Sequence, residues 1–445
     1  MATTSTLVPL RGIARPLSGG SSDFDSLLRR VGECHFVLIG EASHGTHEFY
    51  RVRAEITKRL IREKGFTAVA VEADWPDAFR VNRFVRGRAG DADATEALGG
   101  FRRFPQWMWR NADVLDFVGW LRAYNDARGP DQQTVGFYGL DLYSLHASIE
   151  AVLAYLRVVD PDAARRAQAR YACFDHFGPD LHDYGAATRF GVTPSCEREV
   201  VAQLVELQRA AGEYVKRDGR VDPDALFYAE QNARVVRNAE AYYRAAVTGG
   251  VDSWNLRDKH MAGTLLRLAA YLSREGEQAK VVVWAHNSHL GDAAWTELGA
   301  RGELNVGQLL REQYPHDAVL VGFTTHTGTV TAASDWDAPA ERKRVRPSLE
   351  GSYERLFHDA DLGNSLFIFH HQHDLAWTLD EPRIERAIGV IYRPETERMS
   401  HYFSASLSRQ FDAVLHYDVT RAVEPLERNA QWNRGEMPET FPSAL

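Results

Sequence analysis

Apolar residues occur in short runs that end abruptly in polar residues, and this pattern predicts the framework of the fold. The run from Phe36 to Ile39 is stopped by a glycine, which is typical of a strand buried on both faces. Similar runs predict further strands at residues 67–71, 134–139, 280–285, 318–324, 365–369, 387–391 and 413–417. Helical patterns separate the first of these runs, which indicates an α/β fold with a mostly parallel central sheet flanked by helices.

The helical patterns divide the chain into segments. Residues 47–64 place an apolar side chain on one face every three or four positions, and Gly65 is a natural end for this helix. Residues 145–277 contain helical patterns and hardly any strand signal, so we interpret them as a large helical insertion or lid. The predicted organisation is an N-terminal arm with a first helix (1–34), a first part of the α/β core (35–144), the insertion (145–277), a second part of the core (278–425) and a C-terminal tail (426–445).

Composition limits the class of protein. The 445 residues are 44% hydrophobic and 25% charged and contain no apolar run of 18, so we expect a globular protein without a membrane partner. A formal net charge of −9 opposes nucleic-acid binding, which depends largely on cationic surfaces. The first 20 residues show no secretion signal, and the three cysteines are too few and too scattered for a disulfide framework. We therefore expect a reducing cytoplasm, and the oligomeric state is left open.

Ionisable residues follow four of the predicted strands, at the point where each strand ends. They are Glu41, His44, Glu72, Asp141, His286 and His289. Right-handed crossovers between parallel strands bring the carboxyl ends to one edge of the sheet, where ligands bind in open α/β folds. Burying such groups costs free energy unless they are paired or used in function. The sequence therefore predicts one polar cleft at this edge, covered by residues 145–277.

Two helices carry further candidates for this cleft. Arg53 lies on the border of the buried stripe of its helix, where a guanidinium needs an anionic partner. Glu41 or Glu72 could supply that partner. Further along the chain, Arg257 and His260 share one face of a predicted helix. We therefore count Arg53, Arg257 and His260 among the residues that contact a ligand.

Common catalytic motifs are absent. The sequence has no G-x-S-x-G elbow, no P-loop and no G-x-G-x-x-G after a strand, and the pair His47-Glu48 does not continue to the second histidine of H-E-x-x-H. Two mechanisms remain for a cluster of histidines and carboxylates. A histidine base held by a carboxylate deprotonates water, or the imidazoles of His44, His286 and His289 with a carboxylate hold a divalent metal.

Three other segments have unusual composition. Residues 101–109 are aromatic and basic, and they form either the wall of a pocket or core packing under a loop. The basic run 342–346 is bracketed by prolines, which favours a solvated loop. The histidines in residues 370–373 alternate between opposite faces of an extended segment, so a solvated strand end is a better interpretation than a metal site.

Several blocks of the sequence resemble those of the erythromycin esterase family, over roughly residues 35–425. The blocks are residues 40–49, 71–72, 139–144, 255–262, 284–292, 303–309, 397–403 and 410–414. The resemblance implies hydrolysis of an ester or macrolactone without a required cofactor, with His44 as general base. It also implies that Glu41, Arg53, Glu72, His286 and His289 line the same cleft.

The resulting hypothesis is a hydrolase of a small-molecule ester or lactone. We assign catalysis to His44, Glu41, Glu72 and His286, and substrate binding to Arg53, Asp141, Arg257, His260 and His289. Two alternatives stay open. One is a metal-dependent hydrolase that uses the three histidines named above, and the other is a non-catalytic protein that binds a small metabolite.

Overall fold

The central element of the fold is a mixed sheet. The computed structural model describes residues 10–129, 132–178, 181–217, 223–273, 277–369 and 377–435. Within these ranges nine strands form one sheet in the order β1-β8-β11-β6-β2-β5-β3-β4, with β7 paired to β6. The strands are β1 (Arg15–Pro16), β2 (Phe36–Ile39), β3 (Ala68–Asp74), β4 (Gly136–Asp141), β5 (Val281–Trp284), β6 (Ala318–Ala332), β7 (Glu341–Val345), β8 (Ser365–Ile368) and β11 (Ala413–Thr420).

The middle of this sheet is parallel. Strand β2 pairs with β5 on one side and β6 on the other, so that Phe36 is opposite both Val281 and Ala318. Strands β3, β4 and β11 extend the parallel part, whereas β1, β7 and β8 pair antiparallel at the margins. The predicted α/β fold with a mostly parallel sheet is therefore confirmed.

Two hydrophobic cores cover the two faces of the sheet. Val37 and Ile39 belong to the core that contains α3 (His47–Lys64) and α6 (Ala112–Asp126). Phe36 and Leu38 belong to the other core, which contains α12, α15 and α16 (Val251–Leu272, Val306–Gln313 and Tyr353–Asp359). Because successive side chains of a strand point to opposite faces, a continuous apolar run is what this position requires.

The bounds of α3 agree with the predicted helix 47–64. Its C-terminal residue Gly65 has φ 71°, a left-handed conformation that a glycine adopts without the steric cost of a side chain. The remaining helices of the core region are shorter. They are α2 (Asp25–Val31), α4 (Trp75–Val85), α5 (Ala94–Ala97), α13 (Asn287–Leu290), α14 (Glu297–Ala300), α17 (Trp377–Asp380), α18 (Glu397–Ser400), α19 (Leu407–Gln410) and α20 (Ala430–Arg434).

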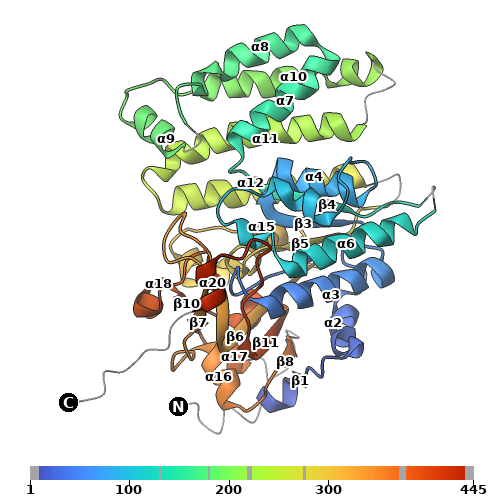
Figure 1. The fold of residues 1–445 in the computed structure, drawn as a ribbon. Helices are drawn as coiled ribbons and strands as arrows, with labels where there is room; N and C mark the ends of the chain where they lie inside the picture. Colours follow the sequence, from blue (N-terminus) through green and yellow to red (C-terminus); the bar gives the residue numbers. More distant parts are fainter. Residues whose placement is uncertain are drawn as a thin grey trace.

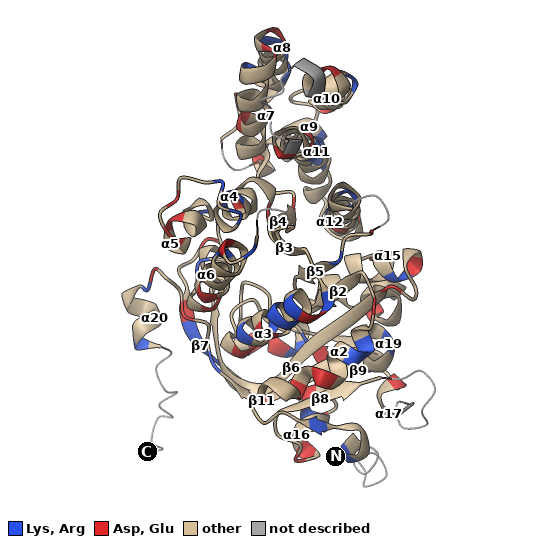
Figure 2. Ribbon diagram, turned by 90° about the vertical axis from the view of Figure 1, so that its right-hand side faces the viewer, with Lys and Arg blue, Asp and Glu red and all other residues tan. Residues whose placement is uncertain are grey.

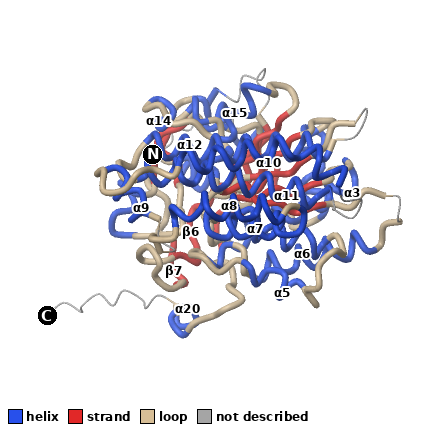
Figure 3. The backbone as a smooth tube through the Cα atoms, turned by 90° about the horizontal axis from the view of Figure 1, so that it is seen from above, coloured by secondary structure: helices blue, strands red, loops and turns tan. Residues whose placement is uncertain are grey.

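Most of the predicted helical region forms a separate layer beyond the β4 edge of the sheet, next to α4 and α12 (Figures 1 and 3). Its helices are α7 (Leu145–Val159), α8 (Pro161–Tyr171), α9 (His182–Arg189), α10 (Glu197–Arg217) and α11 (Pro223–Ala246). They share a hydrophobic core of their own. Along the outer helices α8 and α10, basic and acidic residues are interspersed (Figure 2). Helix α12 packs on the sheet and so belongs structurally to the α/β core.

The structure corrects several local predictions. The predicted strand at 387–391 has only isolated bridges, and the strand lies earlier, at β9 (Arg383–Arg386), where it pairs with β10 (Tyr402–Ala405). The basic run 342–346 was expected in a loop but lies largely in β7, because its alternate residues Lys343 and Val345 are buried against β6. The prediction for residues 370–373 falls outside the described residues.

The cysteine prediction is also corrected at one pair. Cys173 and Cys196 form a disulfide in the helical layer, with 6.1 Å between their Cα atoms. Their separation of 23 residues gave no spacing signal, because the turn that brings them together depends on the packing of α8, α9 and α10. None of the helices in the described ranges combines the length and the apolar character needed to cross a membrane.

Candidate active site

A cavity of about 520 Å³ lies at the carboxyl edge of the parallel strands. The strands β2, β5, β3 and β4 are neighbours in this order, so the residues that follow them meet at one edge. Six residues at or just beyond these strand ends line the cavity, namely His44, Glu72, Asp74, Asp141, His286 and His289. The rings of His44 and His286 are 4.9 Å apart between centroids, which confirms the predicted convergence.

A buried ion pair between Glu41 and Arg53 holds the ring of His44 on the side away from the cavity. Its Nδ1 atom lies 2.9 Å from Oε1 of Glu41, and Oε2 of Glu41 lies 2.6 Å from a terminal nitrogen of Arg53. Glu41 and Arg53 are both 0% exposed. The Tyr50 hydroxyl donates to the His44 carbonyl at 3.0 Å, which fixes the backbone of the turn. The predicted burial and pairing of Arg53 are confirmed.

The Arg53–Glu41 contact is an ion pair by distance rather than an aligned hydrogen bond. The guanidinium has no well-aligned acceptor among the described residues. It lies over the rings of Tyr50 and Trp284, at 4.4 and 5.2 Å from their centroids. These cation–π contacts offset part of the desolvation of the charge. Both Arg53 and Glu41 lie behind His44 and do not line the cavity.

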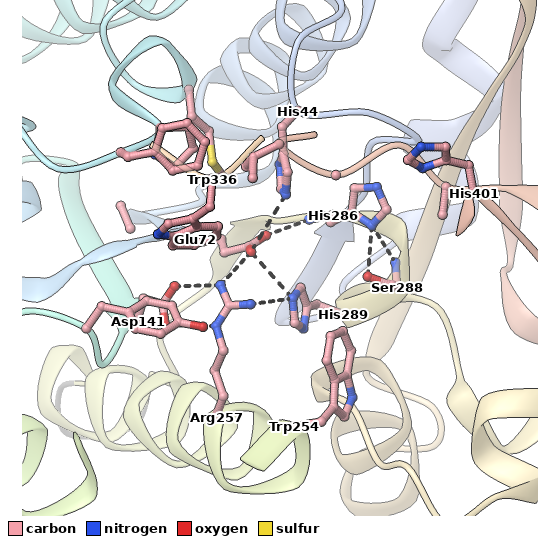
Figure 4. Close-up of a pocket in the computed structure, with 18 of the residues that line it drawn as sticks. His44, Glu72, Asp141, Trp254, Arg257, His286, Ser288, His289, Trp336 and His401 are labelled. Carbon is pink, nitrogen blue, oxygen red and sulfur yellow. Dashed lines mark hydrogen bonds and ion pairs between the residues drawn. The ribbon is translucent and has the colours of Figure 1, made fainter. Parts of the chain in front are cut away.

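Glu72 is the centre of the polar network (Figure 4). Its Oε1 atom accepts from Arg257 at 2.7 Å and lies 4.0 Å from Nε2 of His44. Its Oε2 atom accepts from the backbone N–H of His286 at 2.9 Å. Burial acts to raise the pKa of Glu72, but the charges of His289 and Arg257 outweigh it and hold the pKa well below its ordinary value. Glu72 is therefore an anion in front of His44.

Arg257 connects two of the strand-end carboxylates. It donates to both carboxylate oxygens of Asp141, at 3.0 and 2.6 Å, as well as to Glu72. Burial opposes ionisation of Asp141, but this bidentate contact lowers its pKa overall. The sequence placed Arg257 on the correct helix, α12, and the long side chain reaches across to the ends of β3 and β4.

His289 is enclosed by charged groups. Its Nδ1 atom lies 2.9 Å from Asp258, while Nε2 lies 3.4 Å from Glu72 and 3.1 Å from Arg257. A neutral ring would accept from Arg257, and an imidazolium would donate to Glu72. Burial acts to lower the pKa of His289, but the carboxylates of Asp258 and Glu72 outweigh it and raise the pKa to about 9. We therefore assign the imidazolium at neutral pH.

His286 has the opposite character. Its Nδ1 atom accepts from the backbone N–H of Ser288 at 3.2 Å, so a neutral ring carries its proton on Nε2. Burial and the neighbouring imidazole of His44 lower the pKa of His286 to about 3. Nε2 has no aligned acceptor among the described residues, although the Ala42 carbonyl is near enough to raise the pKa slightly. His286 is thus a neutral ring that lines the cavity, with its Nε2 atom buried.

His260 does not line the cavity, contrary to its assignment to substrate binding. Its Nδ1 atom lies 2.7 Å from Nδ2 of Asn238 on α11, and its Nε2 atom lies 3.5 Å from Thr264. Burial lowers the pKa of His260 to about 4. It shares a helix face with Arg257, but the short imidazole packs between α11, α12 and the backbone of Asp141 at the end of β4, whereas the longer arginine reaches the carboxylates that line the cavity.

Other parts of the chain supply the cavity walls. In the segment 101–109, Phe101, Phe104 and Trp109 line the cavity, while the buried Trp107 packs in the core. Both alternatives, the wall of a pocket and core packing under a loop, therefore apply to this segment. Among the described residues of the helical region 145–277, those that line the cavity all lie in α12, so the described part of the layer α7–α11 does not cover the cavity directly.

A second wall was not identified from the sequence. It comes from residues 387–403 with Trp336, and it includes His401, Tyr402 and Phe403. The only signal for it was the family-like block 397–403, whose place in space depends on the pairing of β9 with β10.

The three histidines do not fit a metal site. Both nitrogens of His289 contact charged side chains, Nδ1 of His286 accepts from Ser288, and Nδ1 of His44 faces Glu41. The guanidinium of Arg257 also stands among these groups. Within the described ranges, no group of three or more histidine, cysteine or carboxylate side chains has an arrangement that could hold a metal ion.

Comparison with known proteins agrees with this geometry. A family model described as erythromycin esterase matches residues 61–420. Erythromycin esterase type II of Escherichia coli is 23% identical over 418 residues, which cover 90% of this chain and 93% of the relative. A putative hydrolase of Bacillus subtilis is 20% identical over 429 residues, which cover 90% of this chain and 88% of the relative.

Solved structures share the fold. A crystal structure of a Bacillus cereus protein has a TM-score of 0.79 at 19% identity, covering 96% of this chain and 100% of that one. A mutant of erythromycin esterase EreC in its open conformation has a TM-score of 0.65 at 19% identity, covering 90% and 94%. The family match spans most of the chain, and the chain therefore belongs to the erythromycin esterase family of ester-hydrolysing enzymes.

Proposed function

We propose that the cavity hydrolyses a carboxylic ester or lactone with His44 as the general base. The observation that carries the proposal is the buried series from Arg53 through Glu41 to Nδ1 of His44. Because Nδ1–H donates to the ionised Glu41, the lone pair of the neutral ring is on Nε2, which faces the cavity. A base must lie within reach of the proton that it removes, and this orientation meets that condition.

The reaction then follows from the groups around the ring. A water molecule attacks the acyl carbon while Nε2 of His44 takes one of its protons, and the carbonyl oxygen becomes an oxyanion. Glu41 and Glu72 stabilise the positive charge that His44 acquires. When the tetrahedral intermediate collapses, the leaving alkoxide takes the proton back from His44. The products are a carboxylic acid and an alcohol, or a hydroxy acid when the substrate is a lactone.

His286 is suited to stabilise the oxyanion. Its pKa of about 3 keeps the ring neutral at neutral pH, with the proton on Nε2. This atom is buried and lacks an aligned partner within the described residues, so the role requires the ring to turn Nε2 toward the substrate oxygen. A neutral donor of this kind strengthens its hydrogen bond as negative charge develops on the substrate oxygen. It does not compete with His44 for the proton of the water.

The substrate and the cofactor requirement are part of the proposal. We infer a metal-independent reaction, because the guanidinium of Arg257 stands among the histidines and carboxylates of the site and no set of three histidine, cysteine or carboxylate side chains in the described ranges has an arrangement that could hold a metal ion. The cavity volume of about 520 Å³ is typical of a site for small molecules. Macrolide lactones are the first candidates, since curated relatives carry the name erythromycin esterase.

The test is a turnover screen of the purified, chelator-treated protein against simple esters, lactones and macrolides. Hydrolysis that persists after chelation supports the histidine-base mechanism. Hydrolysis that returns only with an added divalent ion overturns it in favour of the metal-dependent alternative. Binding of these compounds without any turnover overturns the enzymatic role and favours a metabolite-binding protein.

A further inference from the structure

One wall of the cavity has two carboxylates with too few partners. Asp74 ends β3 and precedes α4, and Asp77 lies in the first turn of α4, so both line the cavity from one direction. Asp74 is only 6% exposed. Its Oδ2 atom accepts from Nε of Arg103 at 3.0 Å, but its Oδ1 atom has no hydrogen-bond partner among the described residues. Neither side chain caps α4.

Asp77 is only partly buried. It makes no hydrogen bond or ion pair with any residue in the described ranges. A Cβ atom at Gly100 would lie 3.2 Å from Oδ1 of Asp77, so the loop backbone packs closely beside this carboxylate. The next residue, Phe101, and the nearby Phe104 both line the cavity. Asp77 is therefore confined between the loop and the cavity without a cation of its own.

Arg257, the other guanidinium that lines the cavity near this wall, already has carboxylate partners elsewhere. Arg257 donates to Asp141 and Glu72, which leaves Arg103 as the one guanidinium paired with Asp74. Arg103 is thus the guanidinium that contacts this pair, while Arg102 and Arg80 carry further charge near Asp77. Leaving the buried Oδ1 of Asp74 without a partner costs free energy, and such a cost is typical of positions whose partner is a ligand.

We propose that Asp74 and Asp77 form a subsite for a protonated amine carried by the ester substrate. The proposal rests on the ester hydrolysis proposed above and specifies its substrate class. An ammonium group at this wall would donate hydrogen bonds to Oδ1 of Asp74 and to Asp77, and it would neutralise the surplus negative charge. The faces of Phe101 and Phe104 suit an organic cation, which aromatic rings attract, better than a hydrated metal ion.

The subsite should depend on pH. Burial, followed by the charge of Asp74, raises the pKa of Asp77 to about 7, while Arg103, Arg102 and Arg80 act to lower it. Asp77 is therefore largely ionised at pH 8 and largely protonated at pH 6. The preference for a cationic substrate should strengthen over this range, because only the ionised carboxylate offsets the charge of the amine.

The experiment uses two esters that differ only in one terminal group, a primary amine in one and a methyl group in the other. The ratio of their kcat/KM values is measured at pH 8 with chelator present. We expect the wild type to favour the amine by about ten- to a hundredfold, the value of a charge-assisted hydrogen bond. Asp77→Asn should reduce this ratio by at least about tenfold, and lowering the pH to 6 should reduce it in the wild type.

A matched control is Asp252→Asn, which removes the same charge from an exposed position on α12 and should leave the ratio unchanged. If both esters are hydrolysed equally well and Asp77→Asn has no effect on the ratio, the subsite is wrong while the proposed hydrolysis stands. If neither ester is hydrolysed, calorimetric binding decides the matter. Tighter binding of the amine that is lost in Asp77→Asn supports the subsite, and equal binding of the two compounds overturns it.

Discussion

Two buried polar networks in this protein differ in the pKa values of their carboxyl groups. The strand-end network consists of Glu41, His44, Arg53, Glu72, Asp141, Arg257, Asp258 and His289. The second, which we call the Arg386 network, lies between α16, β9 and β10. It consists of Glu354, Glu385, Arg386, Tyr392, Glu397 and Tyr402.

The balance of charge explains the difference. In the strand-end network, Arg257 and the imidazolium of His289 face Glu72, whose pKa lies well below its ordinary value. In the Arg386 network the guanidinium lies 3.3 Å from Glu397 and its charge also acts on Glu354, whereas Glu385 faces Glu354, Asn287 and Gln410. Burial raises the pKa values of all three carboxyl groups. Glu72 and Asp141 thus stay ionised because Arg257 and His289 supply enough positive charge to outweigh burial. Where burial outweighs the nearby cations the pKa is raised, as it also is at Asp258 and at Asp74 on the cavity wall.

The largest expected effect is at His44. His44→Asn keeps a polar side chain but removes the base, so kcat should fall by about 10² to 10⁴. Glu41→Gln removes the charge that orients His44, and the double variant should be little worse than His44→Asn alone, because both residues serve one proton transfer. Steady-state kinetics on the four proteins measures this coupling.

The control for this cycle is His316→Asn, at an exposed histidine far from the network, which should keep full activity. A His44→Asn protein within a few-fold of the wild-type rate would contradict the proposed base. The thermal melting temperatures of the variants show whether a loss of rate reflects chemistry or folding.

The second effect concerns the charge of His289. Its folded-state pKa of about 9 exceeds the value near 6.5 of an unfolded chain, so the ring binds its proton more tightly in the folded protein. This stabilisation is fully present below pH 6.5 and is lost as the pH rises through 9. The free energy of unfolding should therefore fall by up to about 3 kcal/mol over this range.

Urea unfolding at a series of pH values measures this slope. His289→Gln keeps a hydrogen-bonding side chain without the titration, so the alkaline loss of stability should be much smaller in this variant. An unchanged slope in His289→Gln would mean that the ring is neutral and accepts from Arg257.

A smaller effect is expected for Arg53→Lys. The ammonium keeps the positive charge, but it loses the planar group that lies over Tyr50 and Trp284 and cannot reach Glu41 in the same geometry. We expect a loss of about 1 to 3 kcal/mol in stability and a lower kcat with little change in KM. The control is Arg29→Lys, at an exposed position on α2 that does not line the cavity. Wild-type stability and kcat in Arg53→Lys would show that Glu41 does not need this arginine.

The strand-end network could be predicted from the sequence for a physical reason. A strand buried on both faces is a continuous apolar run, and the polar residue that ends it marks the sheet edge, so Glu41, Glu72 and His286 could be placed without any structure. The pairing of Arg53 followed from its place on the helix border. The assignment of His260 to substrate binding was wrong, because sharing a helix face with Arg257 does not fix how far a side chain reaches.

The Arg386 network and the second cavity wall could not be predicted from the sequence in this way. Strands β9 and β10 are short, and they pair with each other outside the main sheet, so neither gives a long apolar run. Trp336 reaches the cavity from a turn between β6 and β7, whose position depends on the packing of both strands. Walls built from irregular segments depend on tertiary contacts, and no local pattern in the sequence encodes them.

The smallest expected effect separates the two networks most directly. Glu385 is 0% exposed and has a pKa well above its ordinary value, because burial and the charge of Glu354 disfavour its ionised form. Both effects favour the neutral acid, and Glu385→Gln replaces it with a neutral group of the same shape. The amide oxygen can still accept from Asn287, which approaches Oε1 of Glu385 at 3.3 Å. Stability should change by less than about 1 kcal/mol and kcat should be unaffected. The same substitution at Glu72 removes a charge that pairs with Arg257, so Glu72→Gln should lower both stability and kcat. Chemical unfolding and kinetics on this pair of variants compare one chemical change at two buried sites. If Glu385→Gln proves as damaging as Glu72→Gln, then Glu385 is ionised and the contrast between the networks is wrong.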